Sequence, residues 1–440
     1  MSGGVVLGAD VGTSGLKLVA LDVAGAVVAE AEEGYGYRRP AADRAESDVR
    51  VWRGAFEAAA ARLHPQLAGR PVLALGLSGQ MHGAVLVDRA GAPLRPAVLW
   101  PDRRAVRELD RWRALPAGDR AALANPLLPG MTGPVLAWLA VHEPEVVDRA
   151  AAVLLPKDAL RASVVPGADV AVTDRSDASA TLLWDVVADG WSTAAVGAAG
   201  VAPGLLPAVR RGTEVVGTTV LAGAEVPVVV GGADTPLALL AAGTTSGLQV
   251  NLGTGAQVLR PGWRPRPVAD PVIRGYADAV DGWYAMAALP DGGSAWAVAR
   301  AELVLSWAEF FAAASSAEPG AGGVRFRPSD GSWTGRREGT TRAELARAAV
   351  EGVAAAIGAA ARSLGADDDT PVVLTGGGAR APVVQQALAD VLGRPVRHLG
   401  LRSASAVGAA LLAARGVDLE VEPPPLPDLV VEPRADARRH

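Results

Sequence analysis

Two short glycine-threonine turns, one in each half of the chain, are the residues best suited by type and spacing to bind phosphate. The first reads Asp10-Val11-Gly12-Thr13-Ser14-Gly15, and the second reads Asn251-Leu252-Gly253-Thr254-Gly255. An apolar run leads into each turn and a second β-prone stretch leaves it. Glycine lets backbone N–H groups approach a bound anion closely, and threonine adds a hydroxyl donor. The pair predicts two related domains that close on one polyphosphate.

Two aspartates stand where a carboxylate could take part in a reaction. Asp10 ends a buried strand and could hold Mg²⁺ beside phosphates, although an Asp that caps a turn is equally common. Asp234 follows the apolar run Val226–Val230 and a glycine pair. A partly desolvated carboxylate there could act as general base toward a substrate hydroxyl. Because a helix-like segment starts at Pro236, the local sequence by itself slightly favours a helix N-cap for Asp234.

Two further turns carry groups that could bind a substrate or a nucleotide. Gln80-Met81-His82-Gly83 follows the strand expected at Val72–Leu77 and offers an amide, an apolar contact and an imidazole, which together could grip a polyol. A single His at a strand end is more often structural than functional. Gly376-Gly377-Gly378 lies between a strand and a helix, a place suited to phosphate or a nucleotide, or simply to close packing. It matches neither the dinucleotide fingerprint nor the Walker loop.

Composition excludes several classes of function. The 440 residues carry a net charge of −5 and show no basic stripe, so we expect no nucleic-acid partner. The absence of cysteine rules out disulfides, thiolate metal sites and a cysteine nucleophile. The apolar region Val226–Ala242 is too interrupted by Asp234, glycines and prolines to cross a membrane, and no signal peptide is visible, so we expect a cytoplasmic protein. A homodimer is compatible with the sequence, which does not determine the oligomeric state.

Strands and helices alternate along the chain, which predicts an α/β fold of two domains. An opening hairpin-rich sheet is expected at Val5–Ala9, Leu16–Leu21 and Ala26–Glu32, and it argues against an all-parallel sheet. The strongest helix prediction is Arg342–Leu364, with Thr341 as N-cap. Glu318–Gly339 has no periodicity and is expected to be a loop. The expected helices are Val49–Arg62, Arg103–Arg113, Val135–Val141, Ala295–Ser306, Arg342–Leu364, Ala381–Leu392 and Ser405–Arg415.

The order of these motifs resembles that of the FGGY family of carbohydrate kinases, and within it the xylulokinases. The similarity extends over essentially the whole chain, and the Gln80–Gly83 run favours xylulokinases over glycerol or gluconate kinases. The matching stretches are Gly8–Lys17, Ser78–Gly83, Leu99–Asp102, Pro129–Thr132, Leu154–Asp158, Ser176–Ser179, Gly231–Asp234, Leu252–Gly255, Gly376–Arg380 and Gly408–Ala410.

The resemblance implies two ribonuclease-H-like, actin-like domains, residues 1–236 and 237–440, that flank a catalytic cleft. It implies that Asp234 is the general base, which outweighs the N-cap interpretation, and that Asp10 is the acidic catalytic residue near Mg²⁺. The substrate-binding positions it implies are Gln80, Met81, His82 and Thr235. The nucleotide-binding positions it implies are Gly12, Thr13, Ser14, Lys17, Gly253, Thr254, Gly376, Gly377 and Gly378.

The reaction implied is phosphorylation of D-xylulose to D-xylulose 5-phosphate with ATP and Mg²⁺. D-Ribulose or another polyol is the alternative substrate, and an actin-like ATP-binding protein without kinase activity is the alternative class. The chain departs from the family pattern at four places. Thr235 and Pro101 each replace an Asn, Val135 replaces a frequent Lys, and a shortened Arg325–Glu338 replaces a Gly-Glu-Arg-Thr-Pro loop.

Overall fold

The computed structural model describes residues 3–167, 169, 171–365, 370–425 and 429–434. The chain forms two compact units. Unit 1 contains the residues up to Gly243 together with Trp263–Tyr284 and Ser403–Pro424, and unit 2 contains Thr244–Gly262, Ala285–Arg402 and the residues from Pro425. The sequence-based division after residue 236 assigns Trp263–Tyr284 and Ser403–Pro424 to the second domain, whereas compactness groups them with the first half of the chain.

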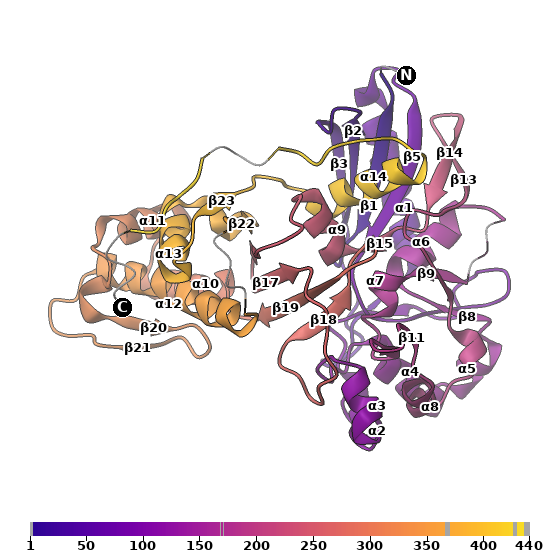
Figure 1. Cartoon of the computed structure of the whole chain (residues 1–440), viewed down its shortest axis with the longest axis horizontal. Helices are drawn as coiled ribbons and strands as arrows, with labels where there is room; N and C mark the ends of the chain where they lie inside the picture. Colours follow the sequence, from indigo (N-terminus) through magenta and orange to yellow (C-terminus); the bar gives the residue numbers. More distant parts are fainter. Residues whose placement is uncertain (1–2, 168, 170, 366–369, 426–428, 435–440) are drawn as a thin grey trace. The chain divides into compact units, whose positions relative to one another are not determined.

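Unit 1 is built on one mixed sheet, visible in Figure 1, with the strand order β13-β14-β5-β1-β2-β3 and β15 paired to β5. The first three strands pair antiparallel, as predicted, while β5 runs parallel to β1 and β14 runs parallel to β5. The bounds are β1 Val5–Val11, β2 Gly15–Asp22, β3 Val27–Gly34, β5 Val72–Gly79, β13 Val215–Leu221, β14 Ala224–Val229 and β15 Gly232–Ala233.

Helices α1 (Val49–Leu63) and α14 (Ala404–Gly416) pack on this sheet. The side chains of α1, including Trp52 and Phe56, share a core cluster with Leu7 of β1. Gly8, the next residue of β1, points to the opposite face and allows α14 to approach, because a Cβ there would lie 1.8 Å from the Ala406 carbonyl oxygen. These two helices fix the strands whose ends carry the candidate residues.

No helix among the described residues is long and apolar enough to cross a membrane.

The other elements of unit 1 surround this core. Their bounds are β4 Glu46–Ser47, η1 His64–Leu67, β6 Val85–Val87, β7 Ala97–Val98, η2 Arg104–Val106, α2 Leu109–Arg113, α3 Ala117–Ala122, α4 Thr132–His142, α5 Pro144–Arg149, β8 Ala152–Leu154, α6 Pro156–Val164, β9 Val172–Asp174, α7 Arg175–Ala178, β10 Trp184–Asp185, β11 Gly190–Trp191, α8 Thr193–Ala199, η3 Pro203–Leu205, β12 Ala208–Arg210, α9 Asp234–Ala241 and β18 Arg274–Ala277.

Unit 2 repeats the plan of unit 1 on the strands β19, β17, β16, β22 and β23, in that order. β16 pairs antiparallel with β17 and parallel with β22, as β1 does with β2 and β5. Even the register repeats: Asp10 lies beside Lys17 and Ser78, and Asn251 lies beside Gln257 and Thr375. The bounds are β16 Gln249–Leu252, β17 Ala256–Pro261, β19 Trp283–Leu289, β22 Val372–Thr375 and β23 Val396–His398.

One helix of unit 2 has the N-cap that the sequence predicted. Helix α12 (Arg342–Ser363) begins after Thr341, whose hydroxyl accepts the Glu344 N–H at 3.2 Å, while the Glu344 carboxylate accepts the Thr341 N–H at 2.7 Å. The strongest helix prediction is therefore confirmed. The other bounds are α10 Gly293–Leu303, α11 Trp307–Ser316, η4 Ala321–Gly323, η5 Gly377–Arg380 and α13 Pro382–Leu392.

The prediction that Glu318–Gly339 is a loop is wrong in part. This segment contains η4 and a small hairpin of β20 (Arg325–Arg327) and β21 (Ser332–Thr334). Phe326 packs on Trp333 with the ring centroids 4.5 Å apart. Strands of three residues are too short to show a period of two in the sequence, which is why periodicity failed to reveal them.

Candidate active site

The ends of three neighbouring strands in unit 1 bring Asp10 and Asp234 to one edge of the sheet. Asp10 of β1 lies beside Ser78 of β5, and Ser78 lies beside Gly232 of β15. The Ser78 hydroxyl donates to Asp10 Oδ1 at 2.8 Å. Gly231 permits the turn that leads to Asp234, because its φ is +89° and a Cβ would lie 2.2 Å from the Leu77 carbonyl oxygen.

Asp234 is a half-buried carboxylate with a raised pKa. Burial, and then the negative charge of Asp10, raise the pKa of Asp234 to about 7. Its Oδ1 accepts the Thr235 N–H at 2.6 Å and the Thr235 hydroxyl at 3.2 Å. Helix α9 begins at Asp234 and its N-cap residue is Ala233, so Asp234 is the first residue of the helix and not the N-cap that the local sequence favoured. A carboxylate with this pKa can accept a proton near neutral pH.

Asp10 has the chemistry to contact a magnesium ion. Burial raises its pKa, while the Ser78 hydrogen bond and the charge of Lys17 oppose the shift. No group of three or more His, Asp or Glu side chains that could hold a metal is gathered in the described part of the chain. Asp10 would therefore contribute one oxygen ligand, and the other ligands of Mg²⁺ would be phosphate oxygens and water. This donor set fits a metal that arrives with a nucleotide.

The first glycine-threonine turn is held rigidly by side chains. Gly12 donates its N–H to the Gly15 carbonyl at 3.0 Å and accepts from Tyr35 Oη at 2.8 Å. Gln80 donates through Nε2 to the Gly12 carbonyl at 3.1 Å and accepts from the Thr13 hydroxyl at 3.1 Å. Both ends of the Gln80 amide thus bind the turn, so this residue helps to fix the shape of the turn. Its predicted contact with substrate stays a prediction.

Trp100 adds a contact to this turn that we did not predict. Its Nε1 donates to Thr13 Oγ1 at 2.9 Å, and half of the side chain is exposed (50%). Ser14, in the same turn, is exposed, and Lys17 is half-buried on β2 opposite Asp10. The indole therefore borders the turn where a phosphate would bind.

His82 and Met81 form a surface suited to a polyol. The Nδ1 atom of His82 lies 2.6 Å from the Ala180 carbonyl oxygen, and a carbonyl can only accept, so Nδ1 carries the proton and Nε2 is left as an acceptor. Burial lowers the pKa of His82 to about 4, which keeps the ring neutral. Met81 is buried, with its Sδ 3.8 Å from Tyr284 Oη. The pair offers one hydrogen-bond acceptor and one apolar contact.

The second glycine-threonine turn and the triple glycine lie together in unit 2. Thr254 is exposed, and its carbonyl accepts the Ser294 N–H at 2.9 Å from the start of α10. A Cβ at Gly376 would lie 2.4 Å from the Leu252 carbonyl oxygen, and one at Gly378 would lie 2.9 Å from Leu252 Cγ. Gly377 faces open space. Close packing therefore explains two of the three glycines, and Gly377 is the most exposed of the three.

Each unit thus gathers its own set of predicted residues. Unit 1 contains Asp10, Gly12, Thr13, Ser14, Lys17, Gln80, Met81, His82, Asp234 and Thr235, whereas Gly253, Thr254 and Gly376–Gly378 belong to unit 2. Sequence reasoning assigned no role to Ser78, Tyr35, Trp100 or Tyr284. Ser78 and Trp100 lie inside motifs that carried the family resemblance, which was the available signal. No motif in the sequence indicated a role for Tyr35 or Tyr284.

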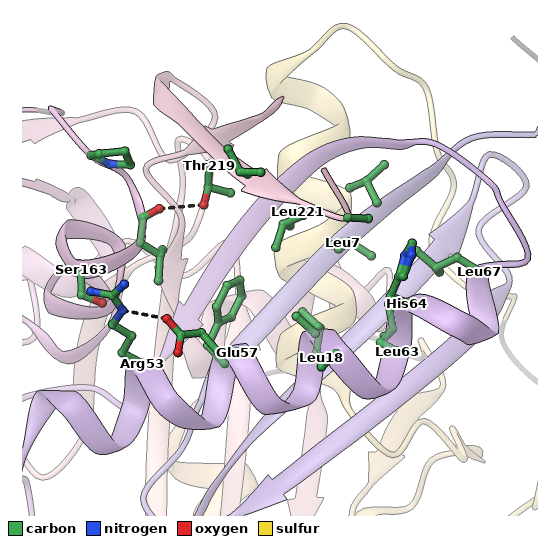
Figure 2. Close-up of a pocket in the computed structure, with 18 residues that line it drawn as sticks. Leu7, Leu18, Arg53, Glu57, Leu63, His64, Leu67, Ser163, Thr219 and Leu221 are labelled. Atoms are coloured by element: carbon green, nitrogen blue, oxygen red, sulfur yellow. Dashed lines mark hydrogen bonds and ion pairs between the residues drawn. The ribbon is translucent and has the colours of Figure 1, made fainter. Parts of the chain in front are cut away.

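A separate hollow in unit 1 contains none of these residues. It has a volume of about 630 Å³ and opens between α1 and β13, with Leu7, Leu18 and Phe56 among its lining (Figure 2). Arg53 donates through Nε to Glu57 Oε1 at 2.8 Å on the same helix. The lining is mainly apolar and has none of the paired carboxylates found at the strand ends, so the candidate active site lies at the strand ends.

Comparison with known proteins identifies the family. The family model for the N-terminal domain of the FGGY family of carbohydrate kinases matches residues 5–241, and that for the C-terminal domain matches residues 248–417. The chain belongs to the FGGY family of carbohydrate kinases. It is therefore a carbohydrate kinase, built on the two ribonuclease-H-like α/β domains of that family.

Individual members of the family are similar to this carbohydrate kinase along nearly their whole length. The xylulose kinase of Escherichia coli (strain K12) is 32% identical over 445 residues, covering 95% of this chain and 90% of that protein. The xylulose kinase of Streptomyces rubiginosus is 33% identical over 439 residues, covering 94% and 88%. The crystal structure of xylulose kinase from Bifidobacterium adolescentis superposes with a TM-score of 0.81 at 27% identity, covering 99% of this chain and 98% of that chain.

Proposed function

We propose that this carbohydrate kinase phosphorylates D-xylulose to D-xylulose 5-phosphate with ATP as donor. The observation that carries the proposal is the half-buried Asp234 carboxylate, whose pKa of about 7 suits a base that works at neutral pH. The similarity to xylulose kinases over nearly the whole chain supports the choice of sugar. The neutral His82 and the buried Met81 supply contacts that a polyol needs.

The proposed reaction is an in-line displacement at the γ-phosphorus. The terminal hydroxyl oxygen of the ketose forms a bond to phosphorus, the bond to ADP breaks, and the hydroxyl proton passes to Asp234. Backbone N–H groups of the first turn donate to the phosphoryl oxygens as charge develops, while the Thr13 hydroxyl, which donates to Gln80 Oε1, holds the turn in shape. In unit 2, the proposed nucleotide contacts are Thr254 and Gly377, and their exposure supports this assignment. Mg²⁺, which Asp10 would help to hold, would neutralise part of the phosphate charge.

The acid side of the pH profile tests the state of Asp234. A base must be deprotonated to act, so kcat/KM for the sugar is expected to fall as the pH drops through about 7, the pKa of Asp234. Between pH 8 and pH 6 the expected decrease is about tenfold. The measurement is initial rate at low sugar concentration across this range with saturating ATP. A flat profile down to pH 5 would show that the pKa of the base lies near that of an ordinary Asp.

Replacing His82 with asparagine tests the sugar side. Residue 82 has a φ of +68°, a conformation that asparagine also tolerates, so the turn is expected to persist. The shorter side chain removes the Nε2 acceptor, and KM for the sugar is expected to rise about tenfold, the worth of roughly one hydrogen bond to substrate. KM for ATP serves as the internal control and is expected to change less than twofold. An unchanged sugar KM would contradict the contact.

A panel of acceptors tests the proposed substrate. ADP release is measured with D-xylulose, D-ribulose, other ketoses, glycerol and gluconate, each with Mg²⁺-ATP. The expected result is the highest kcat/KM for D-xylulose. A higher kcat/KM for D-ribulose or another polyol would show that the proposed substrate is wrong. It would leave the assignment as a carbohydrate kinase unchanged, because family membership does not depend on the preferred sugar.

A further inference from the structure

Asp234 follows a short segment, residues 230–233, that connects β14 to α9 and includes β15. Its Val230 carbonyl accepts a hydrogen bond from Arg161 Nη1 at 2.8 Å, and its Ala233 N–H donates to Ser176 Oγ at 2.9 Å. In each bond the partner of the backbone group is a buried side chain, so the path of the backbone before Asp234 is restrained at both ends of the segment. Ala233 is the residue immediately before the carboxylate, and its N–H is therefore the closer of the two restraints.

The Ser176 hydroxyl has a single orientation in this arrangement. Ser176 is completely buried, and its hydroxyl donates to Asp174 Oδ2 while it accepts from Ala233. The same Asp174 oxygen accepts the Ser176 N–H at 2.7 Å. A hydroxyl with both its donor and its acceptor engaged cannot rotate without breaking a bond, so it transmits the position of Asp174 to Ala233.

Asp174 is in turn anchored by a buried ionic network. Lys157 Nζ lies 2.9 Å from Asp174 Oδ1, 2.6 Å from Asp158 Oδ1 and 3.0 Å from Asp177 Oδ2. Arg161 Nη1 lies 2.7 Å from the same Asp158 oxygen. All five side chains are at most 2% exposed. Because Arg161 also binds Val230, this one network holds both ends of the segment that carries Asp234.

We propose that Ser176 is a positioning residue for phosphoryl transfer, which fixes the place of the Asp234 carboxylate through the backbone N–H of Ala233. The inference rests on the proposed role of Asp234 as base. Ser176 makes no contact with substrate in this proposal. Since a base must lie within hydrogen-bond reach of the attacking hydroxyl, a displacement of even one ångström is expected to slow the reaction strongly.

Ser179, at the C-cap of the same short helix α7, provides a matched control. Its substitution separates the effect of positioning Asp234 from the effect of losing a buried polar group. Ser179 is 2% exposed, and its hydroxyl accepts the Ala277 N–H at 2.9 Å, as the Ser176 hydroxyl accepts that of Ala233. The Ser179 hydroxyl also donates to the Ser176 carbonyl at 3.0 Å, as the Ser176 hydroxyl donates to Asp174. Ser176→Ala and Ser179→Ala therefore each remove one buried donor and one buried acceptor. Both are expected to lower the melting temperature by similar amounts. Only Ser176→Ala removes the hydrogen bond to Ala233, the residue before Asp234.

The test compares kcat, the sugar KM and the melting temperature of the two variants with those of the wild-type enzyme. We expect Ser176→Ala to lower kcat at least tenfold relative to Ser179→Ala, with the sugar KM within about threefold of wild type. Ser176→Thr retains the hydroxyl and is expected to recover most of kcat. Equal kcat in the two alanine variants, per folded enzyme, would overturn the inference. If Ser176→Ala does not fold, Ser176→Cys and Ser179→Cys are compared in the same way.

The same assays separate this inference from the proposed function. Wild-type enzyme without sugar-dependent turnover would contradict the proposed function and remove the inference with it. Wild-type turnover that Asp234→Asn abolishes, together with equal kcat in the two serine variants, would overturn the inference alone.

Discussion

Replacement of Asp234 by asparagine is expected to lower kcat on the order of a thousandfold, while ATP and sugar still bind. The two side chains have nearly the same shape, but the amide cannot take up the proton that the attacking hydroxyl must lose. General base catalysis contributes about 10²–10⁴-fold in enzymes, which sets the expected size of the loss. The measurement is sugar-dependent ADP release at saturating substrates, with binding of ATP and D-xylulose followed separately by calorimetry.

Asp278→Asn is the matched control for this substitution. Asp278 also belongs to unit 1, and its Oδ1 accepts the N–H groups of Val280 at 2.9 Å and Gly282 at 2.8 Å, a role that an amide oxygen can fill. Its kcat is expected to stay within about twofold of wild type, because no reacting group depends on its charge. Turnover near the wild-type value in Asp234→Asn would remove Asp234 from the role of base.

Replacement of Lys157 by methionine is expected to lower the free energy of unfolding by about 3–5 kcal/mol. Lys157 is completely buried, and its ammonium group is in contact with Asp158, Asp174 and Asp177. Methionine fills similar space but leaves three buried carboxylates with one cation, Arg161, in their network. Removal of one partner from a buried ionic cluster leaves the other charges desolvated without compensation. The expected loss of stability is therefore larger than for an ion pair on the surface.

The chain contains one other lysine, Lys17, which provides the control for this substitution. Lys17 is half-buried on β2, and Lys17→Met is expected to change the free energy of unfolding by no more than about 1 kcal/mol. Thermal unfolding followed by circular dichroism is expected to show a melting temperature on the order of 10 °C lower for Lys157→Met. Equal melting temperatures for the two variants would show that the network contributes little to stability.

The positions of the main elements followed from local patterns in the sequence. The predicted helix Arg342–Leu364 and the observed Arg342–Ser363 differ by one residue, because the Thr341–Glu344 capping box is a local signal. The opening hairpin was predictable for the same reason, since its strands alternate with glycine turns. The hairpin after Val324 was missed because its strands have three residues each.

The partners of the site residues did not follow from local patterns. Gln80 was assigned to the sugar from its neighbours Met81 and His82, yet its amide binds Gly12 and Thr13 at 3.1 Å. These contacts span more than sixty positions of sequence and depend on the parallel pairing of β1 with β5. Ser176 shows the same limit, because its bond to Ala233 joins residues 57 positions apart.

The duplicated turns are similar in fold but different in chemistry. The register that places Lys17 and Ser78 beside Asp10 places Gln257 and Thr375 beside Asn251. Asn251 is neutral, and its Nδ2 donates to Gln257 Oε1 at 3.2 Å. Of the two equivalent positions, only Asp10 carries a charge that could contact a metal. The sequence already indicated this asymmetry, and the repeated register explains why the two positions correspond.

The fate of the γ-phosphate tests the proposed function most directly. Wild-type protein is incubated with Mg²⁺-ATP and D-xylulose, and the products are followed by phosphorus NMR. We expect one new phosphate monoester on the terminal carbon of the sugar for each ADP formed, and almost no inorganic phosphate when the sugar is omitted. ADP and inorganic phosphate in equal amounts, with no sugar ester from any ketose or polyol, would contradict it.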